Sequence, residues 1–290
     1  MTQLPAAYEF TPAALALVGA LGLVVGSFLN VVIHRVPRGE SIVQPRSRCP
    51  GCRAAIAAWD NIPVLSWLLL RGKCRRCAAP ISLRYPLIEA TTGLVFVAIA
   101  WVHGASALTV LWWIFAAGLI AGAGIDWDER WIPDSISLGG LAGGLALVPA
   151  ARWLAGEPYP DALLESALGA ALGGGSLWLV GFAHARISQA FGRRFEHWPG
   201  EGNELPTIGT LDYWTWFPGL GFGDVKLMAA VGAFLGPLGV MQTILLAALF
   251  GLLFGLAPLV ARRALNTPFG FGPAIAIAAV VACVTPRLLL

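Results

Sequence analysis

The chain has 290 residues, of which 57% are hydrophobic and only 12% are charged, and its mean hydropathy is +0.73. A soluble globular domain carries about 25% charged residues, so this composition excludes an ordinary soluble protein and predicts a membrane protein. The net charge is only +3, and the basic residues flank apolar runs instead of forming one stripe. We therefore expect membrane lipid, and no nucleic acid, among the partners.

Apolar runs dominate the chain from residue 11 onward. The first run is preceded by a segment without Lys or Arg, so we interpret it as a retained transmembrane helix and not as a cleaved signal peptide. Because about 20 apolar residues span a bilayer, we expect an all-α polytopic membrane protein with about eight transmembrane helices, at residues 11–33, 86–102, 107–125, 135–153, 162–183, 225–238, 239–260 and 269–288. The sixth and seventh are separated only by Gly236, Pro237 and Gly239.

The distribution of basic residues predicts the orientation in the membrane. Alternate connections between the eight runs, with Lys226 just past one of them, hold 17 of the 19 Lys and Arg residues. Cytoplasmic loops carry the excess of Lys and Arg. We therefore expect the long loops in the cytoplasm and both termini on the periplasmic side.

Small residues in the fifth run predict close helix packing, which lipid-embedded helices favour. They are Gly169, Gly173, Gly174 and Gly175.

The polar segment 35–85 is expected to be a small cytoplasmic module between helices 1 and 2. It contains two CxxC pairs, formed by Cys49, Cys52, Cys74 and Cys77. This spacing is typical of a tetrahedral zinc site, and a cytoplasmic position disfavours disulfides. A filled four-cysteine site has no open coordination position, so the zinc would be structural; the alternative is two reduced turns without metal. The apolar stretch ending at Leu70 is too short to span a bilayer, so it lies on the membrane or packs in the module.

Two aspartates at the ends of apolar runs are the strongest catalytic candidates. Asp126 directly follows the third run, and Asp224 directly precedes the sixth in the sequence GFGD at 221–224. The predicted topology puts both on the cytoplasmic side, and two carboxylates sharing one proton are the machinery of aspartic proteolysis. Gly221 and Gly223 would let a peptide backbone approach closely. Each aspartate also has a plainer interpretation, as a headgroup-level charge or as a helix N-terminal charge favoured by the dipole.

Several strings together carry a family resemblance. They are residues 26–37 (GSFLNVVIHRVP), both CxxC pairs, 71–74 (RGKC), 84–89 (RYPLIE), 125–134 (IDWDERWIPD), 221–227 (GFGDVKL) and 271–273 (FGP). With these strings the chain resembles the type IV prepilin peptidases, a family of bifunctional leader peptidases and N-methyltransferases, over nearly its whole length. The domains expected are an N-terminal transmembrane helix at 1–34, the zinc module at 35–85 and a transmembrane aspartic peptidase domain at 86–290.

The resemblance implies an activity and a location. Members lie in the bacterial inner membrane and cut the short basic leader of prepilins or pseudopilins at the cytoplasmic face. They then methylate the new N-terminus with S-adenosylmethionine. The family's catalytic aspartates match Asp126 and Asp224, with Gly221, Gly223, Lys226 and Asp134 as supporting motif residues, and the CxxC pairs accompany the bifunctional members.

The methyl-transfer and leader-binding residues are less defined. No glycine-rich dinucleotide-type motif is present, and the candidates for methyl transfer are Gly72, Lys73, Arg84 and Glu89. Candidates for binding a basic leader are Glu129, Asp134, Glu196, Glu201 and Glu204. The loop before Gly221 is longer than is usual in the family, and its aromatic residues form either a headgroup anchor or a lid.

Two other functions remain open from the sequence. One is a peptidase without methyltransferase activity. The other is an ion-coupled transporter with a zinc-binding regulatory domain, in which Asp126 and Asp224 would relay protons. Both aspartates lie at the ends of apolar runs and not near the midplane, which disfavours the transporter.

Overall fold

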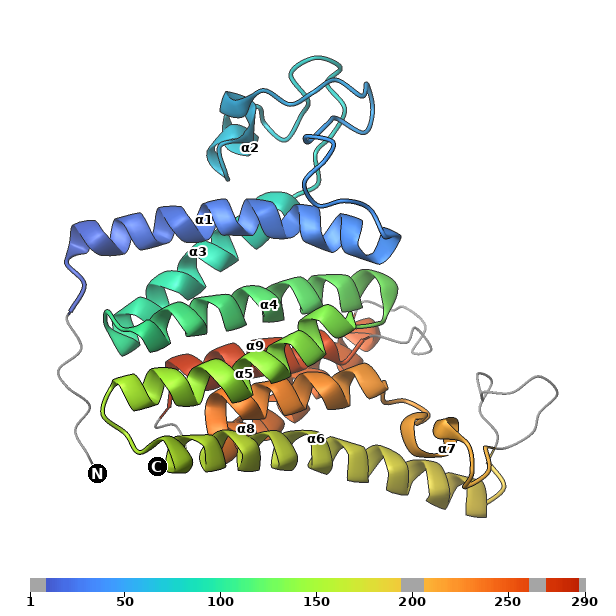
Figure 1. Cartoon of the computed structure of the whole chain (residues 1–290). Coiled ribbons are helices and arrows are strands. Elements are labelled where there is room, and N and C mark those ends of the chain that lie inside the picture. The colour runs from blue at the N-terminus through green and yellow to red at the C-terminus, as the bar shows by residue number, and fades with distance from the viewer. Residues whose placement is uncertain (1–8, 194–205, 261–269, 287–290) are drawn as a thin grey trace. The chain divides into compact units, whose positions relative to one another are not determined.

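The computed structural model describes residues 9–193, 206–260 and 270–286, and these residues contain helices and isolated bridges but no strand. The chain divides into two compact units, Met1–Glu129 and Arg130–Leu290. The first contains α1 (Pro12–Arg35), α2 (Leu65–Leu69), α3 (Arg84–His103) and α4 (Ala107–Glu129). The second contains α5 (Asp134–Leu154), α6 (Tyr159–Ala190), α7 (Leu211–Thr215), α8 (Phe222–Val260) and α9 (Gly272–Val284), all labelled in Figure 1. The predicted all-α class is confirmed.

Six helices within the described residues are long and apolar enough to cross a membrane, namely α1, α3, α4, α5, α6 and α8. The 39-residue α8 is interrupted at Gly236, whose φ of 69° and ψ of −176° are not helical. This break falls where the sequence places the boundary between the sixth and seventh runs. The described part of the last run, α9, has 13 residues, fewer than the ~20 that a spanning helix needs. The polytopic membrane fold is confirmed, and the count of eight stays a prediction.

Glycines and one buried amide hold α1 against α3 in the first unit. A Cβ added to Gly26 would lie 2.7 Å from the Cα of Glu89, so only glycine permits this separation. The Asn30 side chain donates to the Tyr85 carbonyl at the start of α3 (3.2 Å). An apolar cluster continues the contact, and in it the Phe96 and Trp113 rings stack with centroids 5.5 Å apart. The GSFLN string is therefore a helix-packing motif.

Glycines also bring α6 and α8 together in the second unit. A Cβ on Gly169 would overlap the carbonyl oxygen of Gly232, and a Cβ on Gly232 would overlap that of Gly169. Gly173 and Gly174 likewise face α8, whereas nothing lies within 4 Å of a Cβ placed on Gly175. The predicted close packing is confirmed at three of the four glycines.

This crossing gives a matched pair of substitutions. Gly169→Ala should lower the free energy of unfolding by about 1–3 kcal/mol or more, because the added methyl forces the helices apart. Gly175→Ala should be neutral or stabilising by up to about 1 kcal/mol, since alanine is the better helix former. Thermal unfolding of the two purified variants in the same detergent measures the difference. Equal unfolding temperatures would contradict the close contact between α6 and α8 at Gly169.

Candidate active site and metal centre

The two CxxC pairs form the same kind of turn. The Cys49 N–H donates to the Ala54 carbonyl (2.9 Å), and the Cys74 N–H donates to the Ala79 carbonyl (2.8 Å). An isolated bridge closes each turn, Arg48 with Ala55 in the first and Lys73 with Pro80 in the second. Two segments separated by 21 residues therefore present their thiols through equivalent backbone geometry.

The four thiols gather at one point. The Sγ atoms of Cys49, Cys52, Cys74 and Cys77 all lie within 4.8 Å of one another, and those of Cys49 and Cys77 are 3.7 Å apart. A tetrahedral zinc ion with Zn–S bonds of ~2.3 Å requires S···S separations of ~3.8 Å. The cluster therefore fits the structural zinc ion that the sequence predicts.

Backbone donors prepare one thiol for a metal. The N–H groups of Cys77 and Arg76, with a smaller contribution from the Cys49 thiol, lower the pKa of Cys74 to about 6, so it is a thiolate at neutral pH. At Cys77 a hydrogen bond from the Ala79 backbone lowers the pKa, but desolvation and the three other thiols outweigh it and raise the pKa to about 11. A bound metal cation would reverse the rise in the pKa of Cys77, because thiols lose their protons when they ligate a metal.

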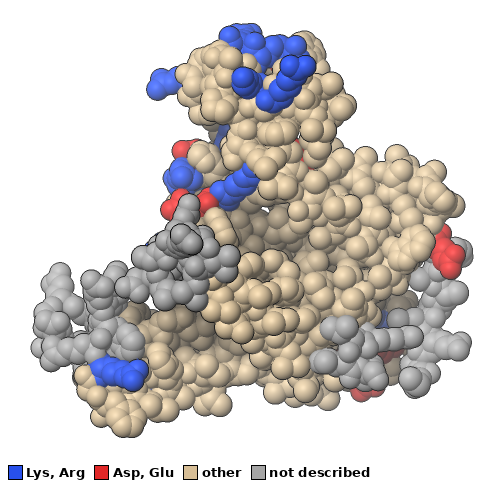
Figure 2. Space-filling model, turned by 180° about the vertical axis from the view of Figure 1, so that it is seen from behind, with Lys and Arg blue, Asp and Glu red and all other residues tan. Residues whose placement is uncertain are grey.

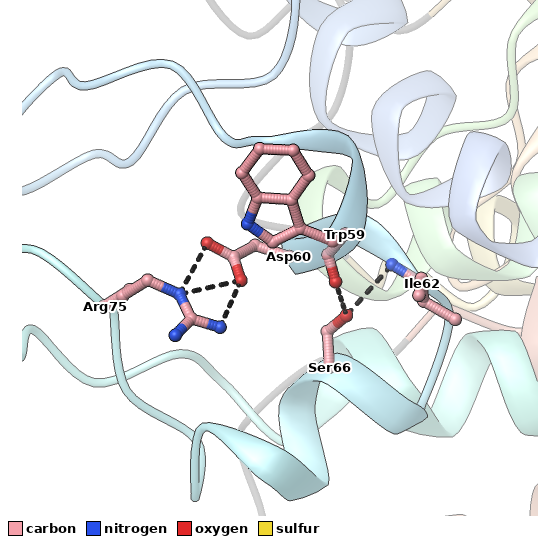
Figure 3. Close-up of polar contacts among 5 residues, drawn as sticks. All are labelled: Trp59, Asp60, Ile62, Ser66 and Arg75. Carbon is pink, nitrogen blue, oxygen red and sulfur yellow. Dashed lines mark hydrogen bonds and ion pairs between the residues drawn. The ribbon is translucent and has the colours of Figure 1, made fainter.

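Polar contacts brace the segment between the two CxxC turns (Figure 3). The Arg75 guanidinium donates to both carboxylate oxygens of Asp60, at 2.7–3.0 Å, and this lowers the pKa of Asp60. The buried Ser66 hydroxyl donates to the Trp59 carbonyl and accepts from the Ile62 N–H, both at 2.9 Å. These contacts hold the backbone of the residues that lead into α2.

Two of the methyl-transfer candidates shape the module itself. Gly72 has a φ of 68°, and a Cβ there would lie 2.9 Å from the Trp67 ring, so glycine is required for this turn. Lys73 is exposed beside the second CxxC turn. A role for either residue in methyl transfer stays a prediction.

The other two methyl-transfer candidates lie on α3 and make long-range contacts in the first unit. Arg84 donates to the Asp128 carboxylate (2.5 Å) and to the Gly124 carbonyl (3.0 Å). The buried Glu89 carboxylate accepts a hydrogen bond from the Val64 N–H (2.7 Å), which ties the module to α3. Their role in methyl transfer also stays a prediction.

Asp126 lies near the C-terminal end of α4 and is only 4% exposed. Arg84 binds Gly124 and Asp128, which lie two positions before and two positions after Asp126. Arg84 therefore fixes the helix end that carries Asp126. Glu129, a candidate for binding the leader, pairs with Arg38 (3.3 Å).

Asp224 lies in the first turn of α8 and is 6% exposed. Its N–H donates to the Gly221 carbonyl (3.0 Å), and its Oδ2 accepts from the Gly221 N–H (3.2 Å). This return bond is the half of a capping box that a carboxylate supplies at the third helical position. Asp224 therefore caps the N-terminus of α8, and the same bond orients one carboxylate oxygen; its catalytic role stays a prediction.

The glycines and charges around Asp224 also have defined contacts. A Cβ on Gly221 would lie 3.4 Å from the Asp224 Oδ2, and a Cβ on Gly223 would lie 3.4 Å from the Ile132 Cβ. Lys226 forms an ion pair with Asp134 at the start of α5. This pair ties α8 to α5 two residues beyond Asp224.

An aromatic cluster between α6 and α7 was not predicted as a unit. The Trp178, Phe182 and Trp214 rings stack, with Phe182 at 4.9 and 5.5 Å from the two indoles, and the Arg186 guanidinium lies 4.0 Å from the Tyr213 ring centroid. In the sequence, the i, i+4 spacing of Trp178, Phe182 and Arg186 could have indicated part of this cluster, because residues four apart are neighbours on a helix. Glu196, Glu201 and Glu204, three candidates for binding the leader, lie outside the described residues.

Comparisons with known proteins cover nearly the whole chain. Residues 20–103 match the bacterial peptidase A24 N-terminal domain, and residues 113–256 match the type IV leader peptidase family. The chain is 37% identical to a prepilin leader peptidase/N-methyltransferase of Neisseria gonorrhoeae, over 92% of this chain and 89% of that protein. It is 37% identical to one of Stutzerimonas stutzeri, over 90% and 87%.

A further relative carries a different name. The chain is 35% identical to a type 4 prepilin-like proteins leader peptide-processing enzyme of Escherichia coli O78:H11, over 91% of this chain and 92% of that protein. No solved structure matches the chain.

Proposed function

The chain belongs to the type IV leader peptidase family, and we propose that it removes the leader of prepilin-like proteins and then methylates the new N-terminus. The observation that carries the proposal is a pair of buried aspartates, Asp126 and Asp224, at the ends of apolar helices. The chain containing them aligns almost end to end with relatives named for both activities. Prepilins and pseudopilins are the proposed substrates.

Asp126 and Asp224 act as the catalytic pair in this proposal. One carboxylate takes a proton from water as it attacks the scissile carbonyl, and the other, protonated, donates to the carbonyl oxygen. The two carboxyl groups share one proton, so that one acts as the base and the other as the acid. The Gly221 N–H holds the Asp224 carboxylate, and Arg84 holds the end of α4 beside Asp126.

The protein is a multi-pass inner membrane protein. We propose that its active site faces the cytoplasm and that both termini are periplasmic. The support is the charge asymmetry, with 17 of the 19 Lys and Arg residues on one side of the eight-run topology. The leader-binding acids Glu129 and Asp134 already form ion pairs, so a basic leader would have to exchange with Arg38 or Lys226.

The second activity uses S-adenosylmethionine as the methyl donor in this proposal, and the zinc module at 35–85 serves it. Gly72, Lys73, Arg84 and Glu89 are the proposed contributors. The other two proposed domains are the N-terminal transmembrane helix at 1–34 and the transmembrane peptidase domain at 86–290. Neither a transporter nor a peptidase lacking methyl transfer is favoured by the relatives' names.

Reconstitution of the purified protein in liposomes tests the proposed class of function. Addition of a full-length prepilin should yield the shortened protein, and the same liposomes should show no ion flux under a proton gradient. Flux without cleavage would instead establish the transporter.

Arg84→Gln tests whether this residue serves cleavage, methyl transfer or both. We expect cleavage to fall about 10- to 100-fold, because a loosened end of α4 misplaces Asp126 and an ångström of misplacement costs up to about 100-fold. Arg76→Gln, which removes an exposed arginine of the module, is the control and should cleave normally. Cleavage and methylation are assayed separately; unchanged cleavage with lost methylation would confine Arg84 to methyl transfer.

A further inference from the structure

The short helix α2 presents an apolar face away from its own module. Leu65, Leu68 and Leu69 are 49%, 59% and 73% exposed, and their i, i+3, i+4 spacing puts them on one side of the helix. The opposite side is bound into the module, where Ser66 bonds to the Trp59 carbonyl and the Trp67 indole donates to the Ile81 carbonyl (3.0 Å). Polar contacts thus turn the leucines outward.

The depth of α2 follows from its bond to α3. The Val64 N–H, immediately before α2, donates to Glu89 (2.7 Å), which is the sixth residue of α3. At 1.5 Å per residue, Glu89 lies about 7.5 Å along the helix from Arg84. Because α3 has 20 residues, about the number that a bilayer core requires, a spanning α3 would place Glu89 about 7.5 Å inside the end of the helix, within the ~5–10 Å depth at which interfacial helices lie. The exposed leucines of α2 would therefore lie at the depth of the interface between headgroups and acyl chains.

Basic residues come shortly after α2 in the sequence. Arg71 and Lys73 lie two and four residues beyond its end, and Arg76 lies three residues further on, all of them exposed. The segment 34–85 holds ten Lys and Arg residues against Glu40 and Asp60, and Asp60 is already paired with Arg75. Figure 2 shows the Lys and Arg side chains gathered over the module. Apolar side chains beside a basic surface are typical of helices that lie in the interface of an anionic membrane.

We propose that α2 is an interfacial helix that docks the zinc module onto the anionic surface of the lipid leaflet. Leu65, Leu68 and Leu69 enter the boundary between headgroups and acyl chains. Arg71 and its basic neighbours bind lipid phosphates. The Glu89 bond sets the depth of the helix, and the module is held flat against the membrane.

Photo-crosslinking of the full-length, zinc-loaded protein tests the proposal. The protein is reconstituted in liposomes of equal parts phosphatidylcholine and phosphatidylglycerol, with p-benzoylphenylalanine in place of Leu68 or, in a second variant, Leu69. Mass spectrometry should find lipid adducts at both positions and few at Glu40, an exposed acid of the same module. Retained zinc verifies that each variant is folded. Adducts with a second copy of the chain, or no more lipid adduct than at Glu40, would overturn the proposal.

A second experiment tests whether the basic residues bind anionic lipid. Removing one basic residue at an anionic surface weakens binding about five-fold. Arg71→Gln should therefore reduce the preference for phosphatidylglycerol over phosphatidylcholine in the Leu68 adducts by about that factor. An unchanged preference would contradict the role of the basic residues.

Discussion

Replacing either Asp126 or Asp224 by Asn abolishes leader cleavage while the protein stays folded. An amide neither takes a proton from water nor alternates with a partner carboxyl group, so the rate should fall by at least about 10²- to 10⁴-fold. The fold should survive, because the amide oxygen of an Asn at 224 can still accept the Gly221 N–H that now binds the carboxylate. The measurement is prepilin processing by each purified variant in liposomes, alongside its thermal unfolding.

Asp161→Asn is the matched control for this experiment. Asp161 also lies in the first turn of a helix, α6, and it is exposed. Removing a charge that only complements the helix dipole costs about 0.3–1 kcal/mol of stability and should leave cleavage intact. If Asp224→Asn behaves like Asp161→Asn, Asp224 is only a helix-terminal charge and the catalytic assignment is wrong.

Replacing Cys77 by Ser removes zinc from the module and, with it, methylation. A structural zinc ion contributes about 10–16 kcal/mol to the folding of small zinc domains, and a Ser hydroxyl does not replace the thiolate of a four-cysteine site. Cleavage should decline much less, because Asp126 and Asp224 lie outside the module. Zinc content by atomic absorption, cleavage, and methylation are measured on the same preparation.

Cys283→Ala is the control for the loss of a thiol. Cys283 is buried in α9 and lies outside the four-cysteine cluster. This variant should keep its zinc and both activities. Equal loss of cleavage and methylation in Cys77→Ser would mean that the module is needed for the stability of the whole protein and not for methyl transfer in particular.

Features encoded by short stretches of sequence were predictable. Each CxxC pair makes a turn within a few residues, so the spacing alone indicates four thiols around one metal. The Gly-Pro step at Gly236 marks the interruption of α8. Asp224 and Gly221 are three residues apart, and the capping arrangement between them follows from that spacing.

Contacts between distant segments were not predictable from one sequence. The Arg84–Asp128 pair and the Val64–Glu89 bond depend on how α3 is rotated about its axis, and a helix with an almost uniformly apolar surface has no periodic pattern that fixes this rotation. The same limit explains Gly175, which belongs to the predicted glycine run but faces away from α8. The orientation of α2 was left open for the related reason that five residues are too few to show a period.

The N-terminal mass of a processed prepilin tests the account most directly. The purified protein, supplied with S-adenosylmethionine and a prepilin in liposomes, should release a mature protein that lacks its leader and carries one methyl group on its first residue. The Asp126→Asn variant should leave the prepilin uncut. A mature protein without the methyl group would contradict the second activity, and a prepilin left intact by the unaltered protein would contradict the account as a whole.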